Sequence, residues 1–388
     1  MYLPNYRNGS IVNLVNTILA ACDVRTLYDP LPKLDSAQLS KAENIVLIVL
    51  DGIGYEYLQE QDKNSILGRH LKEKITSVFP STTAACISSF LTGVAPQQHA
   101  ITGWFVYLKE LGTVAKILPF SPRFGGGPFS RAGVFPEKIF SQRNIAQKIV
   151  KRKTFQITKK SLAYSDYTSS LTRGAKTLSY KDKNLSGFFK KTKKAIKSGR
   201  KKKFVYAYWS QFDALCHHYG VHSKQTEKHF EELNIGMEKF VQSIKGTNSI
   251  LIITADHGII DTEKSKTIRV NDYPKLMETL ALPLCGDPRL AYCYLRPKLT
   301  KQFKDFIEEY FSHACELRKS EELIENNFFG LSSPSRKLYD RVGDYTLIMK
   351  DNYVIKDFLI GEKEKFLIGN HGGVSSKEMF VPLITIEA

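Results

Sequence analysis

The sequence of 388 residues predicts an α/β protein with a central, mostly parallel sheet flanked by helices. Continuous apolar runs at 45–50, 204–209 and 249–255 have the length and composition of fully buried strands. Stretches with helical spacing, at 141–151 and 224–245, lie between these runs. Strands that alternate with helices are typical of a parallel sheet with helices on its faces.

The chain begins with a predicted helix over 10–22, where apolar residues recur at helical spacing. Each of the three strand-like runs is then followed by an aspartate, namely Asp51, Asp213 and Asp256. Ligands of open α/β sheets bind at the carboxyl ends of the strands. The sequence therefore predicts one polar site at this edge of the sheet.

Three histidines accompany these aspartates. Asp213 and His217 form D-x-x-x-H, His257 directly follows Asp256, and His371 lies in an Asn-His-Gly-Gly turn. Each residue alone is also explained by a helix cap or a tight turn. Together, imidazole nitrogens and carboxylate oxygens are the ligand set of zinc, and two divalent ions use about six such ligands. Two ions about 3.5–4 Å apart clamp the attacking and leaving oxygens of a displacement at phosphorus.

A cluster of hydroxyl side chains precedes a predicted helix over 84–92. It contains Ser81, Thr82 and Thr83. The N-terminus of a helix presents free N–H groups and a positive dipole to an anion, so a hydroxyl there is well placed for phosphoryl transfer. The alternative is that one of these hydroxyls caps the helix.

Taken in order, these motifs resemble the type I phosphodiesterase/nucleotide pyrophosphatase family of the alkaline phosphatase superfamily. The order is Asp-Gly after a first strand, Thr before a helix that ends in Thr-Gly, P-x-x-H, D-x-x-x-H-x-x-G, D-H-G and H-G-G. The resemblance runs from residue 45 to the end of the chain. It implies the alkaline-phosphatase-like version of the predicted sheet, with inserted cap segments.

The resemblance also implies the roles of individual residues. Thr83, nine residues before Thr92, takes the position of the nucleophile, attacks phosphorus and forms a phosphothreonine intermediate. Two divalent metal ions, taken to be zinc, are implied with the Thr83 oxygen between them. The implied ligands are Asp213, His217 and His371 for one ion, and Asp51, Asp256 and His257 for the other.

One position departs from the family. Animal-type members carry an asparagine five residues after the P-x-x-H histidine, where it helps to bind a phosphate oxygen. This chain has Trp104 there, five residues after His99. The indole either stacks on a base of the substrate or fills the core.

The implied activity is hydrolysis of phosphodiester or pyrophosphate bonds, with a nucleotide-like anionic small molecule as substrate. Two alternatives stay open on the same fold, a phosphomonoesterase and a phosphonate hydrolase, because the metal set does not separate them. A third is a non-catalytic, basic nucleic-acid-binding protein, and its only support is the net charge of +17.

This charge is concentrated in one segment. Residues 151–203 contain 18 Lys and Arg against two acidic residues. The predicted organisation has a catalytic core at 1–104, 204–284 and 351–388, an inserted segment at 105–203 with the basic tract, and a small α+β insertion at 285–350. The tract is either the solvated face of a lysine-rich helix near 190–203 or part of a cap that attracts anionic substrate.

The six cysteines show no C-x-x-C spacing, which is typical of reduced thiols in an intracellular protein. No apolar run approaches the roughly 18 residues of a membrane helix. The N-terminal residues lack the pattern of a signal peptide. We therefore expect a cytoplasmic protein without a membrane span, with signal-independent secretion left open.

Overall fold

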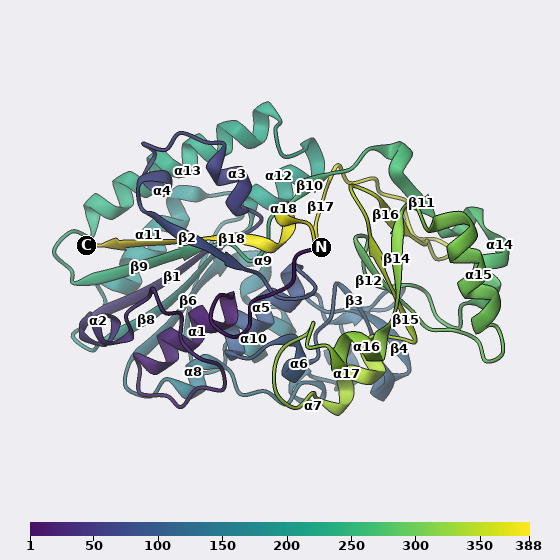
Figure 1. The fold of residues 1–388 in the computed structure, drawn as a ribbon. Coiled ribbons are helices and arrows are strands. Elements are labelled where there is room, and N and C mark those ends of the chain that lie inside the picture. The colour runs from purple at the N-terminus through teal and green to yellow at the C-terminus, as the bar shows by residue number, and fades with distance from the viewer.

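The strand β1, Asn44–Leu50, lies in the middle of a seven-stranded sheet in the computed structural model, which describes residues 1–388 (Figure 1). All seven of its residues are buried, as the apolar run predicts. The order across the sheet is β2 (Leu71–Thr76), β18 (Phe380–Glu387), β9 (Ser249–Thr254), β1, β8 (Lys203–Trp209), β6 (Lys153–Lys159) and β7 (Lys176–Tyr180). The five strands from β9 to β7 run parallel, and only β18 is antiparallel to its neighbours. The predicted fold class is confirmed.

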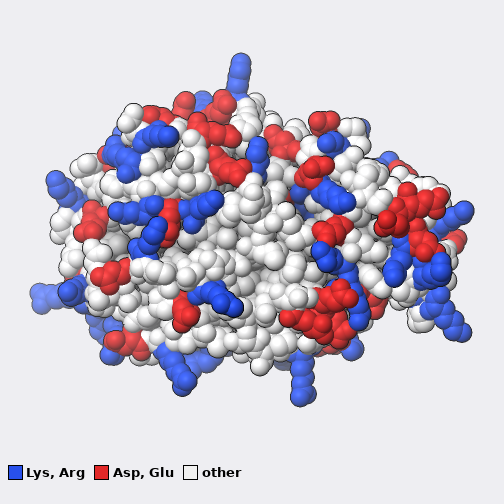
Figure 2. Space-filling model, in the orientation of Figure 1, with Lys and Arg blue, Asp and Glu red and all other residues white.

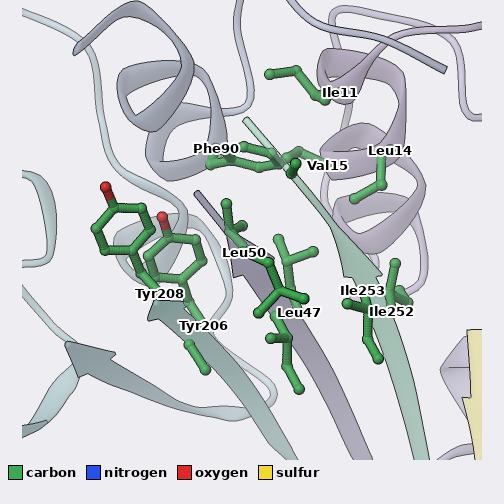
Figure 3. Close-up of a cluster of buried hydrophobic side chains, with 14 of the residues drawn as sticks. Ile11, Leu14, Val15, Leu47, Leu50, Phe90, Tyr206, Tyr208, Ile252 and Ile253 are labelled. Atoms are coloured by element: carbon green, nitrogen blue, oxygen red, sulfur yellow. The ribbon is translucent and has the colours of Figure 1, made fainter. Parts of the chain in front are cut away.

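One face of this sheet is covered by α1, Ile11–Ala20, and α5, Thr83–Thr92. Apolar side chains of both helices pack on the strands beneath them, as Figure 3 shows. The ring of Phe90 lies 6.4 Å from that of Tyr206 on β8. This packing holds the N-terminal end of α5 near the carboxyl edge of the sheet.

The opposite face is covered by α11, Leu185–Ile196, and α13, Lys224–Ser243. Trp209 lies at the end of β8, and its ring is 5.4 Å from that of Phe188 and 5.8 Å from that of His229. Because side chains alternate along a strand, Tyr206 and Trp209 pack on different faces. Helices on both faces explain why the central strands are apolar throughout.

Shorter helices complete this half of the molecule. They are α2 (Ser36–Lys41), α3 (Tyr55–Gln59), α4 (Ile66–Arg69), α6 (Pro96–His99), α7 (Pro136–Ile139), α8 (Ile145–Lys148), α9 (Lys160–Ala163), α10 (Asp166–Leu171), α12 (Gln211–Tyr219) and α18 (Ser376–Met379). The predicted helix over 141–151 is therefore only one turn, whereas those over 10–22, 84–92 and 224–245 correspond to α1, α5 and α13.

A second seven-stranded sheet lies beside the first and is antiparallel throughout (Figure 1). Its order is β14 (Cys315–Lys319), β15 (Tyr345–Met349), β13 (Leu290–Cys293), β12 (Cys285–Asp287), β3 (Phe105–Leu108), β4 (Thr113–Lys116) and β5 (Ser121–Pro122). The helices α14 (Pro274–Thr279), α15 (Thr300–Phe311), α16 (Ser320–Glu325) and α17 (Arg336–Arg341) accompany it. Two small apolar cores lie on its faces: Tyr292 contributes to one and Cys293 to the other.

This sheet changes the expected organisation. Residues 105–122 and 285–349, which we expected in two separate insertions, join in one sheet where β3 pairs with β12. The contact is close: a Cβ atom on Gly103 would lie 2.5 Å from the Cα atom of Gly286. Glycine is therefore required where the two segments meet. Local sequence does not reveal this pairing because more than 160 residues separate the segments.

The basic tract belongs to the central sheet and to a helix that covers it. Strands β6 and β7 extend the central sheet beyond β8, and α11 packs over β6, β7 and β8. An edge strand has only one neighbouring strand, and many of its side chains are partly exposed. The sequence of β7, Lys-Thr-Leu-Ser-Tyr, is accordingly mixed and lacks the apolar run of a central strand.

The helix α11 buries Phe188, Phe189, Ala195 and Ile196 and exposes Lys190 and Lys194. This is the solvated helix face that we considered as the alternative to a cap. On the face of the molecule in Figure 2, basic and acidic side chains are interspersed.

Two short strand pairs connect the halves. β10 (Ile260–Asp261) pairs with β17 (Gly369–Asn370), and β11 (Thr267–Arg269) runs parallel to β16 (Val354–Lys356). No helix has both the length and the apolar composition that a bilayer span requires. All six cysteines are buried free thiols.

Arg152 offers a test of the extended central sheet. Its buried guanidinium donates hydrogen bonds to the carbonyls of Leu39, Ser40 and Ala42 at 2.8–3.2 Å, and so joins the start of β6 to the C-terminal end of α2. We expect Arg152→Ala to lower the free energy of unfolding by about 3 kcal/mol in urea titration, because buried acceptors lose a charged donor. The neighbouring Lys151→Ala, which breaks only an exposed pair with Asp23, should leave the free energy of unfolding nearly unchanged. Equal effects of the two substitutions would contradict this role.

Candidate active site

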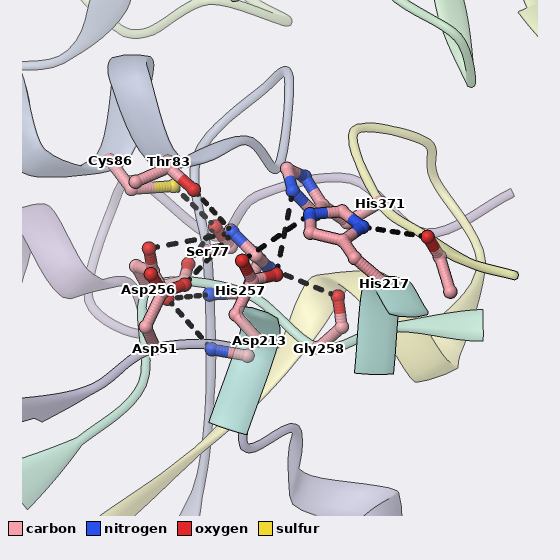
Figure 4. Close-up of polar contacts among 12 residues, drawn as sticks. Asp51, Ser77, Thr83, Cys86, Asp213, His217, Asp256, His257, Gly258 and His371 are labelled. Atoms are coloured by element: carbon pink, nitrogen blue, oxygen red, sulfur yellow. Dashed lines mark hydrogen bonds and ion pairs between the residues drawn. The ribbon is translucent and has the colours of Figure 1, made fainter. Parts of the chain in front are cut away.

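The carboxyl edge of the central sheet brings together the residues that follow β1 and β9. Val49 pairs with Thr254, and two positions further along each strand come Asp51 and Asp256. His257 Nε2 lies 3.5 Å from Asp51 Oδ1 and 3.4 Å from Asp256 Oδ2 (Figure 4). All three side chains are buried, so these atoms form a compact triad with room for one cation.

A second triad lies beside the first. The strand β8 leads into α12, where Asp213 and His217 are one helical turn apart and face the same side. His217 Nε2 lies 3.3 Å from Asp213 Oδ2, and His371 Nε2 lies 3.7 Å from Asp213 Oδ1. His371 also stacks on His257 of the first triad, with ring centroids 3.8 Å apart. The structure thus brings together all six predicted ligands as two adjacent groups of three.

The hydrogen bonds around the triads leave oxygen atoms free at their centres. Asp256 Oδ1 accepts from the backbone N–H groups of Gly52 and His257, and Asp51 Oδ2 accepts from the hydroxyl of Tyr208. The other oxygens, Asp51 Oδ1 and Asp256 Oδ2, are buried without a hydrogen-bond partner, as is Asp213 Oδ1. Buried carboxylate oxygens without partners are costly unless a cation binds them. The donor set therefore fits two divalent cations.

Backbone carbonyl groups orient two of the three histidines toward the triads. His217 Nδ1 lies 2.7 Å from the carbonyl oxygen of Gly369, and His257 Nδ1 lies 3.2 Å from that of Gly258. A carbonyl only accepts, so Nδ1 carries the hydrogen and Nε2 of the neutral ring presents its lone pair to the triad. Carbonyl groups in this position commonly orient metal-bound histidines.

Close packing of these groups shifts their pKa values strongly. Burial, and then the charges of Asp256 and Asp213, raise the pKa of Asp51 well above its usual range. Burial lowers the pKa of His217, but the adjacent Asp213 carboxylate outweighs it and raises that pKa to about 9. Burial and the charge of His257 lower the pKa of His371. Without a metal ion, protons on Asp51 and His217 offset part of the concentrated charge.

Thr83 lies at the first position of α5, next to the first triad. Its Oγ1 atom is 3.0 Å from His257 Nε2 (Figure 4). Thr82 is the N-cap residue but makes no side-chain capping bond, and the Ser81 hydroxyl donates to the carbonyl of Gly373 in the His371 loop. Capping thus does not occupy the Thr83 hydroxyl, which lies beside the candidate metal ligands and the free N–H groups of the helix.

Trp104 and His99, which the sequence motifs also single out, contact other protein groups near the site. The backbone N–H of Trp104 donates to Asp287 Oδ2 at 3.1 Å, and its half-buried indole stacks on no other aromatic ring. His99 of P-x-x-H is buried and lies 3.0 Å from the Ser89 hydroxyl on α5. Burial, with a smaller contribution from Arg341, lowers the pKa of His99 to about 3, so the ring stays neutral and supports α5.

The turn between β12 and β13, which the sequence does not single out, reaches the site from the second sheet. Asp287 faces Thr82 and the Trp104 N–H, and burial raises its pKa to about 6. Arg289 makes a buried ion pair with Glu378, at 2.9 Å. Glu378 in turn accepts from the N–H of Gly373, two residues after His371. No motif marks these residues, because their importance depends on contacts between distant segments.

With this geometry in view, the chain was compared with known proteins. Residues 45–373 match the type I phosphodiesterase/nucleotide pyrophosphatase family. The chain belongs to this family. It is thereby a hydrolase-family protein, as the order of its motifs predicts. No curated protein sequence matches it closely enough to add to this assignment.

Solved structures support the same fold. The murine ectonucleotide pyrophosphatase/phosphodiesterase 5 is 16% identical, with a TM-score of 0.66 over 87% of each chain. An inactive variant of that mouse protein, solved in complex with AMP, has a TM-score of 0.65 over 87% of each chain at 17% identity. Phosphonoacetate hydrolase from Sinorhizobium meliloti, in complex with phosphonoacetate, is 17% identical, with a TM-score of 0.64 over 88% of this chain and 89% of its own. At such identities the likeness shows the alkaline-phosphatase-like fold alone.

Proton release on metal binding tests the electrostatics of the site. His217 must lose its proton to bind a cation, and its pKa of about 9 means that it is charged at pH 7.5. We expect zinc addition to the metal-free protein to release at least about one proton at pH 7.5 and fewer at pH 9.5, as measured by calorimetry in buffers of different ionisation enthalpy. His218→Ala, which removes the exposed neighbour, should leave the release unchanged. Release that is absent at pH 7.5, or that rises with pH, would contradict the protonated His217.

Proposed function

We propose that the protein is a two-metal hydrolase that cleaves phosphodiester or pyrophosphate bonds of nucleotide-like substrates, with Thr83 as nucleophile. The observation that carries the proposal is the Thr83 hydroxyl, 3.0 Å from His257, at the N-terminus of α5 and beside two triads of unsatisfied metal-type ligands. A helix N-terminus and two cation sites both attract negative charge, so a hydroxyl placed between them is suited to react with a bound anion such as a phosphate.

The proposed ligands are the two triads, with Thr83 Oγ1 as a further ligand shared with the substrate. Two divalent ions, which we propose are zinc, would polarise the phosphoryl oxygens and lower the pKa of the Thr83 hydroxyl. Two of the ligand histidines, His217 and His257, would hold their Nε2 atoms toward the ions through the carbonyls of Gly369 and Gly258. The free N–H groups in the first turn of α5 would stabilise negative charge that develops on the phosphoryl oxygens.

In the first step, Thr83 Oγ1 gives its proton to solvent and attacks phosphorus in line, and the departing oxygen takes up a proton from solvent. The Thr83 Oγ1–phosphorus bond forms while the bond from phosphorus to the leaving oxygen breaks, which gives a phosphothreonine. In the second step, water attacks the same phosphorus from the opposite side. The Thr83 oxygen then leaves and regains a proton, so the enzyme returns to its starting state.

Proposals on the substrate rest on the relatives. The mouse ectonucleotide pyrophosphatase/phosphodiesterase 5 binds AMP in its solved complex, and we propose a nucleotide-like substrate for this chain by analogy. We propose that Trp104 contacts the leaving group or base, because its half-buried indole is not stacked within the protein.

Phosphonate hydrolysis is the second candidate. The phosphonoacetate hydrolase complex matches this chain over a similar length and with a similar TM-score to the mouse protein. The same triads would serve either reaction, so fold and ligand set do not separate the two. A phosphomonoesterase is supported only by the shared fold.

A comparison of three substrates decides between these activities. We expect the zinc-loaded protein to hydrolyse bis(p-nitrophenyl) phosphate with a kcat/KM at least about tenfold above that for p-nitrophenyl phosphate or phosphonoacetate. The reason is that a diester presents one fewer free phosphoryl oxygen for the site to bind than a monoester or a phosphonate does. A preference for the monoester or for phosphonoacetate by tenfold or more would replace the diesterase assignment with the corresponding alternative.

Thr83→Ala tests the nucleophile. Removal of an attacking hydroxyl in other hydrolases lowers kcat by several orders of magnitude, and we expect a loss of about 10³-fold or more here. Metal content, measured by inductively coupled plasma mass spectrometry, should remain near two ions per chain, because both triads are intact. Thr83→Ser keeps the hydroxyl and should retain measurable turnover. Full activity of the alanine variant with metal bound would rule out the phosphothreonine route.

A further inference from the structure

Lys356 is a basic residue that the proposed mechanism does not use. It is the last residue of β16, where Val354 and Ile355 are buried and Lys356 is half-buried. Ile355 belongs to an apolar core of the second sheet, and its N–H donates to the carbonyl of Pro288, next to Asp287. Because side chains alternate along a strand, Lys356 points away from that core. Its ammonium contacts the carbonyl of Lys365, three residues before Ile368, whose N–H donates to the carbonyl oxygen of His217 at 3.0 Å.

The Lys356 ammonium has no acidic partner. Its closest polar contact is the carbonyl oxygen of Lys365, at 3.4 Å, and it takes part in none of the ion pairs of the structure. The acids of the surrounding segment are already paired. Asp357 and Glu362 bind Arg123 at 2.9 and 3.0 Å, and Glu364 binds Arg269 at 2.6 Å.

This arrangement is unfavourable for the free protein. Burial without a compensating anion lowers the pKa of Lys356 to about 8, so the group is still mostly charged at neutral pH. Arg123 and Arg289, the buried cations nearby in the second half of the molecule, each have a carboxylate within 3.0 Å. A half-buried cation near a candidate metal site, with the acids of its own segment already bound to arginines, is suited to an anion that arrives with the substrate.

We propose that Lys356 binds a second anionic group of the substrate, separate from the phosphoryl group that Thr83 attacks. The inference rests on the proposed function, and it narrows the substrate to molecules with a further phosphate or carboxylate. Such molecules include a nucleoside triphosphate and a phosphonocarboxylate. A diester with uncharged substituents would gain nothing from Lys356.

Steady-state kinetics test this specificity with ATP, phosphonoacetate and bis(p-nitrophenyl) phosphate. We expect Lys356→Ala to lower kcat/KM for ATP or phosphonoacetate by about 10–100-fold, mainly through KM, because a charge-assisted contact is lost. The loss for bis(p-nitrophenyl) phosphate, whose substituents carry no charge, should be at least about tenfold smaller. Lys356→Arg keeps the charge and should restore part of the loss. Lys363→Ala removes an exposed, unpaired lysine of the adjacent loop and should leave all three values unchanged. Of ATP and phosphonoacetate, the substrate that the substitution affects identifies a phosphate or a carboxylate as the second group bound.

Equilibrium binding gives a readout that does not depend on turnover. In zinc-loaded Thr83→Ala protein, titration calorimetry should show that Lys356→Ala weakens ATP by about tenfold or more and AMP by less, if the second group is a phosphate. Phosphonoacetate against methylphosphonate is the corresponding pair for a carboxylate. Metal content should stay the same in both backgrounds.

The outcomes separate the two proposals. If the wild-type protein hydrolyses none of the three substrates, the proposed function fails, and the binding titrations still decide on Lys356. If hydrolysis occurs but Lys356→Ala affects substrates with and without a second anionic group alike, the Lys356 inference is wrong and the proposed function stands. Unchanged binding of both charged ligands would also overturn the inference.

Discussion

The alignment of β9, β1 and β8 is the constraint on which the site depends. These parallel strands are in register, so the residues that follow them lie at the same edge of the sheet. This holds irrespective of the length and structure of the segments between the strands. That alignment forces Asp51, Asp256 and, through α12, Asp213 into one buried region. Like charges at such short range are unfavourable, and protons, histidines or metal ions must offset them. The oxygens left without partners face the centres of the triads, where a cation would bind.

The second sheet contributes contacts that position the loops of the site at the edge of the central sheet. Its β12–β13 turn holds both sides of the site: Asp287 faces Thr82 and Trp104, and Arg289 acts through Glu378 on the loop that carries His371. A buried ion pair is weak support for stability, because both charges lose their hydration. Here it orients backbone groups next to a ligand, which suits a positional role. The loop that carries Thr82 and Thr83 and the loop that carries His371 thus depend on contacts with a separate sheet.

The high positive charge has a local structural origin. Most of the excess lies in residues 151–203, which form an edge of the central sheet and the helix that covers it. Lysines on the exposed face of α11 cost little, because they remain hydrated while its apolar face packs on the strands. The more informative basic residue is Lys356, which lies outside this tract. It contacts the carbonyl of Lys365, three residues before the Ile368 N–H that donates to the carbonyl of His217. Total charge therefore indicates less about the substrate than one half-buried ammonium without a partner.

The sequence by itself determined the α/β class, the three central strands and the six residues of the triads, because apolar runs and the residues that end them are local patterns. It also singled out Thr83, through a resemblance to a family. Only the tertiary structure decided that 105–122 and 285–349 share one sheet and that β6 and β7 extend the other. It also decided the contacts of Asp287, Glu378 and Lys356. Edge strands lack a continuous apolar signal, and pairings between distant segments leave no periodicity in either one, so these features exist only once the chain has folded.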